Sequence, residues 1–301
     1  MGLKYMPLVT IGIPFYNPGP AFIDAVRSVF AQSYPNWELL LVDDGSTDGS
    51  VDLAKRIKDP RVRVFVDGKH QGLVARLNQI TDLASGSYIA RMDADDLMHP
   101  ERIEKQVMFL EQHPEVDVVD TGAIILTRDG YPVGVRGLEN RIPSAFEILK
   151  WGGFLHPSVM GRRKWFKENP YDPRYIRAED RELWARTYGR TRFAHIPEAL
   201  YMYRFVGNVR LKPYLESYRS ERKIILRYGP AMIGISQSLY LYLRSLAKSV
   251  ILMALSLFRM EQIITKRKYN YIPPQLLSES IKKLQHIQRQ DVPGWEIIRP
   301  G

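Results

Sequence analysis

The chain has 301 residues, no cysteine and a net charge of +10 at pH 7. The lack of cysteine excludes disulfides, thiolate metal sites and a cysteine nucleophile, and it agrees with a reducing cytoplasm. Residues 201–301 hold 17 Lys and Arg against 6 Asp and Glu, whereas residues 1–200 hold 26 against 27. The pattern therefore indicates a near-neutral enzyme with a basic C-terminal third. The N-terminus shows no signal-peptide pattern, so we expect a cytoplasmic protein.

Strand and helix patterns alternate along the first 130 residues. Apolar β-rich runs predict strands at 9–15, 37–42, 61–66, 87–92 and from 116 to 119. Helical spacing of apolar residues predicts helices at 21–32, 48–58, 73–84 and 100–112. This order predicts an α/β fold of the Rossmann-like kind, with a mostly parallel sheet and helices on both of its faces.

The middle third is less regular. Residues 124–127 and 132–135 flank a turn and predict a hairpin, and a short apolar segment lies at 159–160. Helices are expected at 143–150 and 179–188, followed by two short strands at 191–196 and 199–203.

Three carboxylates, Asp93, Asp95 and Asp96, follow the strand at 87–92 directly. Charges this close repel one another unless a cation neutralises them, and oxygen ligands suit Mg²⁺ or Mn²⁺. The end of a strand in an open α/β sheet is also where such folds bind ligands. The pattern predicts a divalent metal there. The alternative is an acidic turn in which Asp95 or Asp96 caps a helix near Pro100.

Five segments together resemble the family 2 inverting nucleotide-sugar glycosyltransferases, which have a single GT-A domain. They are VTIGIPFYN at 9–17, LLVDDGSTD at 40–48, GLVARLN at 72–78, GSYIARMDADD at 86–96 and AEDRELW at 178–184. The resemblance implies a GT-A domain over residues 1–205, with a nucleotide-binding half at about 7–120 and an acceptor half at about 121–205. Residues 206–301 are then a basic, amphipathic helical extension.

The resemblance implies a donor site at the strand ends. Asp95 would bind the metal, and Asp93 would contact the metal or the ribose, with Ala94 between them. A metal there would act as a Lewis acid on the departing diphosphate. A histidine that many relatives carry after a Tyr-Arg pair is missing after Tyr203 and Arg204, which leaves the metal fewer protein ligands and Arg204 as a candidate phosphate contact.

The nucleotide base has its own predicted contacts. Asp44 matches the position that reads uracil N3 in the family, with Asp43 as the alternative. Tyr16 offers a ring for stacking a base or for core packing, and Pro14 and Phe15 would shape the pocket through their backbone. Two roles are open for Arg76. It would either neutralise the diphosphate or be an ordinary residue on the surface of a helix.

The acceptor half contains the predicted catalytic base. Asp180 would take the proton of the acceptor hydroxyl in an inverting transfer, or else cap the helix that follows it. Glu179, His156 and Trp184 are acceptor-side candidates, although core packing is the commoner role for such a tryptophan. His195 is predicted to be structural.

The C-terminal third contains a very apolar helix at 238–258. Its serines at 238, 245, 249 and 256 share one face, with Arg244 and Lys248 nearby. Such a helix suits the interface of an anionic membrane better than a spanning position. The alternative is packing against the catalytic domain or in an oligomer. A further basic amphipathic helix is expected at 276–290.

These patterns predict a metal-dependent glycosyltransferase that moves a sugar from a nucleoside diphosphate donor, UDP-linked, to a lipid-linked or growing surface glycan. It would act on the inner face of the plasma membrane. The alternative within enzymes is a metal-dependent nucleotidyltransferase that makes nucleotide sugars, although residues 14–20 lack its usual Gly-rich basic loop. No nucleic-acid recognition motif is present, so we expect no nucleic acid as partner.

Overall fold

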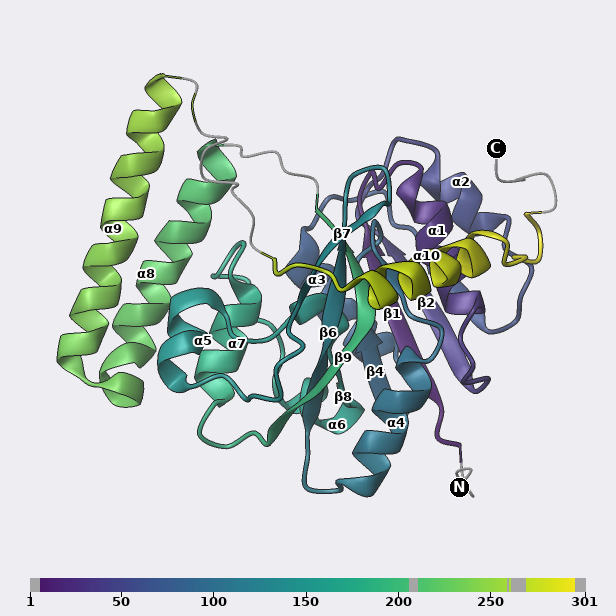
Figure 1. Ribbon diagram of the computed structural model, residues 1–301, viewed down its shortest axis with the longest axis horizontal. Helices are drawn as coiled ribbons and strands as arrows, with labels where there is room; N and C mark the ends of the chain where they lie inside the picture. Colours follow the sequence, from purple (N-terminus) through teal and green to yellow (C-terminus); the bar gives the residue numbers. More distant parts are fainter. Residues whose placement is uncertain (1–5, 206–210, 259, 261–268, 296–301) are drawn as a thin grey trace.

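The structure is a computed structural model that describes residues 6–205, 211–258, 260 and 269–295. The described residues form a nine-stranded sheet in the order β3-β2-β1-β4-β8-β6-β9-β5, with β7 paired to β6 (Figure 1). The strands are β1 Val9–Phe15, β2 Trp37–Asp43, β3 Val62–Phe65, β4 Tyr88–Arg91, β5 Leu97–Met98, β6 Val118–Leu126, β7 Pro132–Arg136, β8 Met160–Arg162 and β9 Phe193–Arg204.

The sheet is mostly parallel, as predicted. Strands β3, β2, β1 and β4 run parallel to one another, and so do β6 and β9. The short strands β5, β7 and β8 pair antiparallel with their neighbours. The carboxyl ends of β1, β2 and β4 therefore meet along one edge, where a ligand site is expected.

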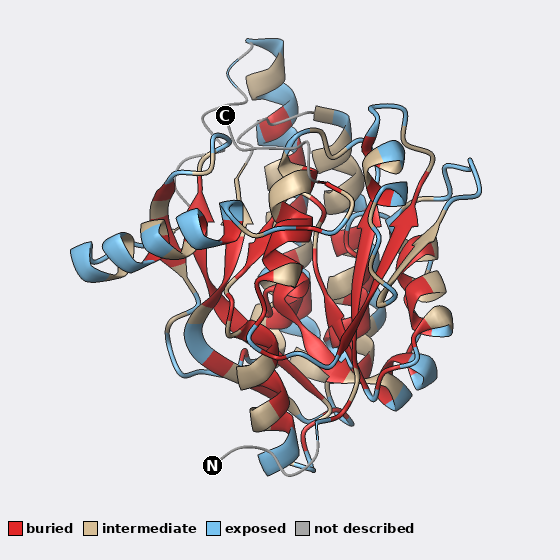
Figure 2. Ribbon diagram, turned by 90° about the vertical axis from the view of Figure 1, so that its right-hand side faces the viewer, coloured by how far each residue is buried: buried red, intermediate tan, exposed pale blue. Residues whose placement is uncertain are grey.

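Helices cover both faces of the sheet, and the alternation along β2 shows why. Leu39 and Leu41 belong to a core cluster with α1 (Ala21–Phe30) and α4 (Arg102–Gln112). Leu40 and Val42 join a second cluster with α3 (Leu73–Leu83) and α7 (Glu179–Thr187). Figure 2 shows the buried residues concentrated on the strands and on the helix surfaces that face them. The helices are α1 Ala21–Phe30, α2 Ser50–Lys55, α3 Leu73–Leu83, α4 Arg102–Gln112, α5 Ala145–Trp151, α6 Arg163–Glu168, α7 Glu179–Thr187, α8 Leu211–Ile233, α9 Ile235–Leu257 and α10 Pro274–Gln288, and a 3-10 turn spans His156–Ser158.

Some predicted boundaries were wrong. The segments at 116–119 and 124–127 are parts of one strand, β6, and the two predicted strands at 191–196 and 199–203 form the single strand β9. The register shifts between these strands, so that Thr121 pairs with Ile196 and Gly122 with Ala199. This irregularity accommodates Pro197, which sequence reasoning takes as a strand end. Residues 211–233, which lie in the expected helical extension, form α8 with Pro230 inside it.

The C-terminal third forms two separate structures rather than one appendage. Helices α8 and α9 form a hairpin in which α8 packs on α5 and α7 of the acceptor half (Figure 1). Helix α10 instead packs on α1 and β7. Beyond it, Trp295 is buried, and its indole N–H donates to the carbonyl of Leu53, 2.8 Å away. The last described residues therefore return to α2 in the N-terminal part of the chain.

Candidate functional site

A cleft of about 690 Å³ lies at the carboxyl ends of β1 and β4. It is bounded by the loop that follows β1, the carboxylates that follow β4, the tip of the β6–β7 hairpin and the end of β9. Its lining residues are Pro14, Tyr16, Asn17, Pro18, Gly19, Pro20, Ala21, Asp93, Ala94, Asp95, Arg128, Asp129 and Arg204. The cleft brings together predicted donor-site residues from distant parts of the chain.

The loop after β1 is joined by hydrogen bonds to the loop after β2. Asn17 adopts a left-handed backbone with φ of 47°. Its N–H donates to the Ser46 hydroxyl at 3.0 Å, and its side-chain oxygen accepts from the Thr47 N–H at 2.7 Å. Asn17 thus fixes the turn.

Two aromatic residues of this loop have different environments. Tyr16 is 52% exposed at the cleft, with its ring centroid 4.3 Å from that of His70. Phe15 is buried, packs on Phe22 and does not line the cleft, and its backbone carbonyl accepts from the Asp44 N–H at 2.8 Å.

Asp44 lies just beyond the end of β2 and is almost fully buried. Its carboxylate accepts hydrogen bonds from the backbone N–H groups of Gln71 (2.8 Å) and Gly72 (3.0 Å), and it lies 2.9 Å from the His70 ring. Asp43 uses its two oxygens for the N–H groups of Gly45 and Ser46. Asp43 therefore shapes the turn, whereas Asp44 organises the 70–72 loop.

Arg76 is buried and fully engaged, which differs from both roles proposed for it. Its Nε donates to Asp44 at 2.9 Å, and its two terminal nitrogens contact Asp67 at 2.9 and 2.7 Å. The remaining N–H groups reach the side chain of Gln79 and the carbonyl of Lys69. All five donors of the guanidinium are used. Arg76 therefore positions Asp44 and does not line the cleft.

The carboxylates after β4 differ in their partners. Asp93 is paired with Arg91, whose terminal nitrogen donates to it at 2.7 Å. No other described residue donates a hydrogen bond to the Asp95 carboxylate. Burial, and next the charge of Asp93, raise the pKa of Asp95. An acceptor-only group in this setting suits a cation.

A complete metal site is not preformed in the described part of the chain. No group of three or more Asp, Glu or His side chains is arranged there to hold an ion. The donor set that fits a cation is therefore Asp95 with Asp93, and further ligands would come from water or from a substrate diphosphate, as is usual for Mg²⁺.

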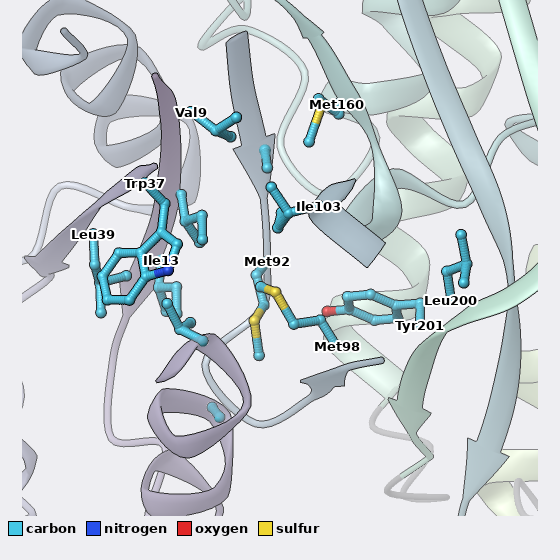
Figure 3. Packing of buried hydrophobic residues seen from close by; sticks show 14 of the residues in the cluster. Val9, Ile13, Trp37, Leu39, Met92, Met98, Ile103, Met160, Leu200 and Tyr201 are labelled. Carbon is cyan, nitrogen blue, oxygen red and sulfur yellow. The ribbon is translucent and has the colours of Figure 1, made fainter. Parts of the chain in front are cut away.

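Asp96 does not cap a helix, because α4 starts at Arg102 and its N-cap is Glu101. Instead, Asp96 accepts hydrogen bonds from the Tyr201 hydroxyl at 2.9 Å and from the Arg204 N–H at 2.6 Å. The Asp93 N–H donates to the same hydroxyl at 3.2 Å. Figure 3 shows Tyr201 reaching from β9 toward Met92 and Met98 on either side of this loop. Strand β9 thus fixes the loop that carries the carboxylates.

The acceptor-side carboxylates stand at the start of α7. Asp180 is half-buried, and its oxygen accepts from the Arg181 N–H at 2.7 Å. It does not cap the helix, whose N-cap is Ala178. Burial, and next the Asp180 charge, raise the pKa of Glu179 to about 7, and Asp93 adds to the rise. The pair therefore lies within electrostatic reach of the donor carboxylates.

His156 and Trp184 are buried beneath this region. The His156 ring nitrogen lies 2.8 Å from the Tyr171 hydroxyl, and burial lowers the pKa of His156 well below its usual value. Trp184 is fully buried against Phe154, Phe193 and Trp165. Neither side chain lines a surface in this structure. Trp184 packs in the core, and His156 has a supporting position.

His195 has partners at both ring nitrogens. Nδ1 lies 2.8 Å from the Asp120 carboxylate and Nε2 lies 2.9 Å from the carbonyl of Gly137. This arrangement matches the structural role expected for it.

Several residues of the site were missed by sequence reasoning. Arg102 is buried and donates to the carbonyl of Arg91 at 2.9 Å, which holds the end of β4. Tyr201 holds the carboxylate loop, and Arg128 and Asp129 line the cleft from the hairpin tip. No local pattern marks these residues, because their partners are distant in sequence.

The fold and the site define an α/β protein with a pair of carboxylates, Asp93 and Asp95, in a cleft at the carboxyl ends of its parallel strands. The model of the family described as "Glycosyl transferase family 2" matches residues 10–182. The chain belongs to glycosyl transferase family 2, and it is a glycosyltransferase with the GT-A fold.

Similar sequences and structures agree with this assignment. EpsE of Bacillus subtilis (strain 168), named as a glycosyltransferase, is 36% identical over 207 residues, which cover 66% of this chain and 73% of EpsE. TuaG of the same organism, named as a glycosyltransferase of teichuronic acid biosynthesis, is 34% identical, with 52% of this chain and 61% of TuaG covered.

Solved structures show the same fold. S. aureus TarS 1–349 in complex with UDP-GlcNAc has a TM-score of 0.60 at 17% identity, with 94% of this chain and 81% of that chain covered. The mannosyltransferase PcManGT of Pyrobaculum calidifontis, in complex with GDP-Man and Mn²⁺, has a TM-score of 0.59 at 16% identity, with 95% and 88% covered.

Proposed function

We propose that the protein transfers a sugar, with inversion, from a UDP-sugar to a hydroxyl of a lipid-linked or growing surface glycan, with a divalent metal bound at Asp95 and Asp93. The observation that carries the proposal is the Asp95 carboxylate, which lines the donor cleft and accepts no hydrogen bond from another described residue. A nucleotidyltransferase is no longer favoured, because the family transfers glycosyl groups.

The metal, Mn²⁺ or Mg²⁺, would supply Lewis-acid stabilisation of the departing diphosphate. Asp95 would hold it directly, and Asp93, already paired with Arg91, would assist. Arg204 lines the same cleft and is anchored to the carbonyl of Asp95 at 2.9 Å, so it can add positive charge near the phosphates.

The nucleotide would lie in the cleft beside Tyr16. Tyr16 is exposed and can stack on a base, and stacking contributes about 1–3 kcal/mol. Asp44 is held rigidly by Arg76 and the 70–72 backbone, so its carboxylate is oriented before the base arrives. Complexes of TarS with UDP and UDP-GlcNAc support UDP as the nucleotide.

Asp180 is proposed as the base that removes the acceptor proton. Glu179 beside it is buried, and its raised pKa of about 7 leaves it partly protonated near neutral pH. A protonated Glu179 adds no negative charge, so the Asp180 carboxylate is free to act. The two residues therefore have separate roles.

The α8–α9 hairpin is proposed to bind an anionic membrane. The serine stripe predicted on α9 faces α8, where Arg222 donates to the hydroxyl of Ser249 at 2.9 Å. The apolar side chains therefore face outward, at Ile235, Leu239, Tyr240, Leu243, Leu246, Val250, Ile251, Met253 and Leu257. Among the described residues, α9 is the one helix whose length and apolar composition would allow it to cross a membrane.

Several features favour an interfacial position for this hairpin. Lys223 and Arg227 are exposed on the neighbouring helix α8, where they can meet anionic headgroups. Helix α8 packs along one side of α9, so only the opposite side of α9 is available to lipid. Such a position would place the enzyme on the inner face of the plasma membrane, close to a lipid-linked acceptor. The name of TuaG, which refers to teichuronic acid biosynthesis, supports a surface glycan as product.

The metal assignment is tested by UDP binding with and without Mn²⁺, measured by calorimetry. We expect Mn²⁺ to tighten UDP binding by wild type and to have little effect on Asp95→Asn. Release of UDP from UDP-GlcNAc, followed in the same proteins, should fall in parallel. Asp129→Asn is the matched control, because Asp129 lines the same cleft but is not proposed as a ligand. Mn²⁺-dependent binding that survives in Asp95→Asn would remove the assignment.

A further inference from the structure

A second, smaller cavity of about 150 Å³ lies on the acceptor side of the molecule. The last residue of β7, the end of α5 and the loop after it form its walls, and His195 and Asp120 form part of its lining. Gly153 lines this cavity, and a Cβ placed on its neighbour Gly152 would lie 3.7 Å from the Asp180 carboxylate. The cavity therefore adjoins the proposed base.

Arg136 is the cation of this cavity that lacks a direct partner, although its charge acts at longer range on the buried Asp120 carboxylate. It makes no hydrogen bond or ion pair with any other described residue, and its guanidinium carbon lies 5.8 Å from the ring centroid of Trp151. A guanidinium that contacts a ring uses its flat face, and its N–H groups, which point outward in its plane, remain available. Trp151 itself is 38% exposed.

The other charged residues around the cavity have partners. Arg141 contacts both oxygens of Glu147, at 2.6 and 2.7 Å, and it lies 3.8 Å from Glu139. Asp120 accepts from the Leu155 N–H at 2.8 Å and lies 2.8 Å from His195. An incoming anion would therefore meet one cation whose N–H groups have no direct partner, Arg136, at a half-buried position where a charged hydrogen bond is stronger than in water.

We infer that this cavity binds an anionic unit of the acceptor glycan, whose carboxylate or phosphate meets Arg136 while its sugar ring lies on Trp151. The inference rests on the proposed function. If Asp180 is the base that acts on the acceptor, a sugar bound in the neighbouring cavity belongs to the acceptor glycan. An exposed tryptophan beside an unpaired arginine suits a charged sugar better than a neutral one.

The test is equilibrium binding of three probes to the full chain loaded with UDP and Mg²⁺. The probes are trigalacturonic acid, maltotriose and glucose 6-phosphate. We expect at least one anionic probe to bind about tenfold more tightly than maltotriose. The stronger of the two anionic probes identifies the group as carboxylate or phosphate.

Variants identify the residues responsible. Arg136→Gln should reduce the anionic preference by about tenfold and leave maltotriose binding unchanged, whereas Trp151→Ala should weaken all three sugars. Arg136→Lys should restore part of the preference. Arg219→Gln, which removes the same charge from the exposed surface of α8, is the matched control and should bind like wild type.

Two results would overturn the inference. One is equal affinity for charged and neutral probes, and the other is an equal loss in Arg136→Gln and Arg219→Gln. UDP affinity and thermal unfolding of each variant show that the fold and donor site are intact. If wild type fails to bind UDP, the proposed function fails, whereas intact UDP binding without an Arg136-dependent preference refutes the acceptor cavity alone.

Discussion

Single residues in this protein act mostly by holding other residues. Arg76 uses all its donors to orient Asp44 and the loop after β3, and Tyr201 connects the backbone of Asp93 to the carboxylate of Asp96. The proposed reactive groups, Asp95 and Asp180, are half-buried and few by comparison. Charged side chains that are buried with full partners keep the reactive ones in fixed positions.

The base can be identified by comparing two neighbouring carboxylates. Asp180→Asn should keep UDP binding near wild type but lower transfer by about 10²–10⁴-fold, because it removes the proton acceptor alone. Glu179→Gln, measured in the same coupled assay for UDP release, should lose much less. A larger loss in Glu179→Gln than in Asp180→Asn would assign the base to Glu179.

The raised pKa of Glu179, about 7 against an ordinary 4.5, also affects stability. The folded protein holds this proton more tightly than the unfolded chain, so the free energy of unfolding should fall as pH rises from about 4.5 to about 7. Glu179→Gln should flatten this fall and be more stable than wild type above pH 8, by on the order of 2 kcal/mol.

Urea unfolding at several pH values, with EDTA present so that no metal contributes, measures this effect. Glu168→Gln is the control, because Glu168 is exposed on α6. Parallel pH curves for wild type and Glu179→Gln would contradict the linkage.

At the scale of elements, α9 combines two faces with opposite requirements. Its serines at 238, 245 and 249 are buried against α8, and its leucines at 239, 243 and 257 are exposed. A helix in water normally has the reverse arrangement. The hairpin with α8 therefore satisfies the polar stripe internally and leaves the apolar surface for a membrane or for another copy of the chain.

Leu239→Glu combined with Leu243→Glu should abolish most binding to vesicles of anionic phospholipid, because two charges would then lie on the apolar face of α9. Co-sedimentation with vesicles measures the effect. Tyr271→Glu is the control, since Tyr271 is 78% exposed but lies outside the hairpin.

Two outcomes would count against membrane binding. The first is that the wild-type protein does not co-sediment with the vesicles. The second is that the double variant binds them as well as wild type does. If wild type is dimeric in solution and the double variant is monomeric, the apolar face is instead an interface between copies of the chain.

At the scale of the whole molecule, the C-terminal segment ties distant parts of the chain together. Helix α10 packs on α1 and β7, and Lys58 donates its backbone N–H to the carbonyl of Pro293 at 2.8 Å. Trp295 is 4% exposed and contacts α2 through its indole N–H. The last described residues therefore belong to the core cluster formed by β1, β2 and α1.

Trp295→Ala should lower the free energy of unfolding by about 3 kcal/mol, because it empties a buried tryptophan site. Urea denaturation followed by circular dichroism measures the change. Trp151→Ala serves as the control, since Trp151 is half-exposed and its loss should cost less than about 1 kcal/mol. A similar small effect for both variants would show that the chain end is not part of the stabilising core.

The sequence by itself determined the alternation of strands and helices from β1 to α4 apart from the short strand β5, the mostly parallel sheet and the family. These features depend on local periodicity and on motifs whose members lie within about ten residues of one another. The carboxylates at 93 and 95, and Asp44 at the end of its strand, could be placed at one edge because parallel strands end together.

Tertiary structure alone decided which of these residues face the cleft. Arg76 and Trp184 carry patterns that suit a site, yet both are buried by partners from other elements. The orientation of the α9 serines and the return of Trp295 to α2 also depend on contacts across large sequence separations. A side chain's partners are set by packing, and packing is a property of the assembled fold that no local pattern records.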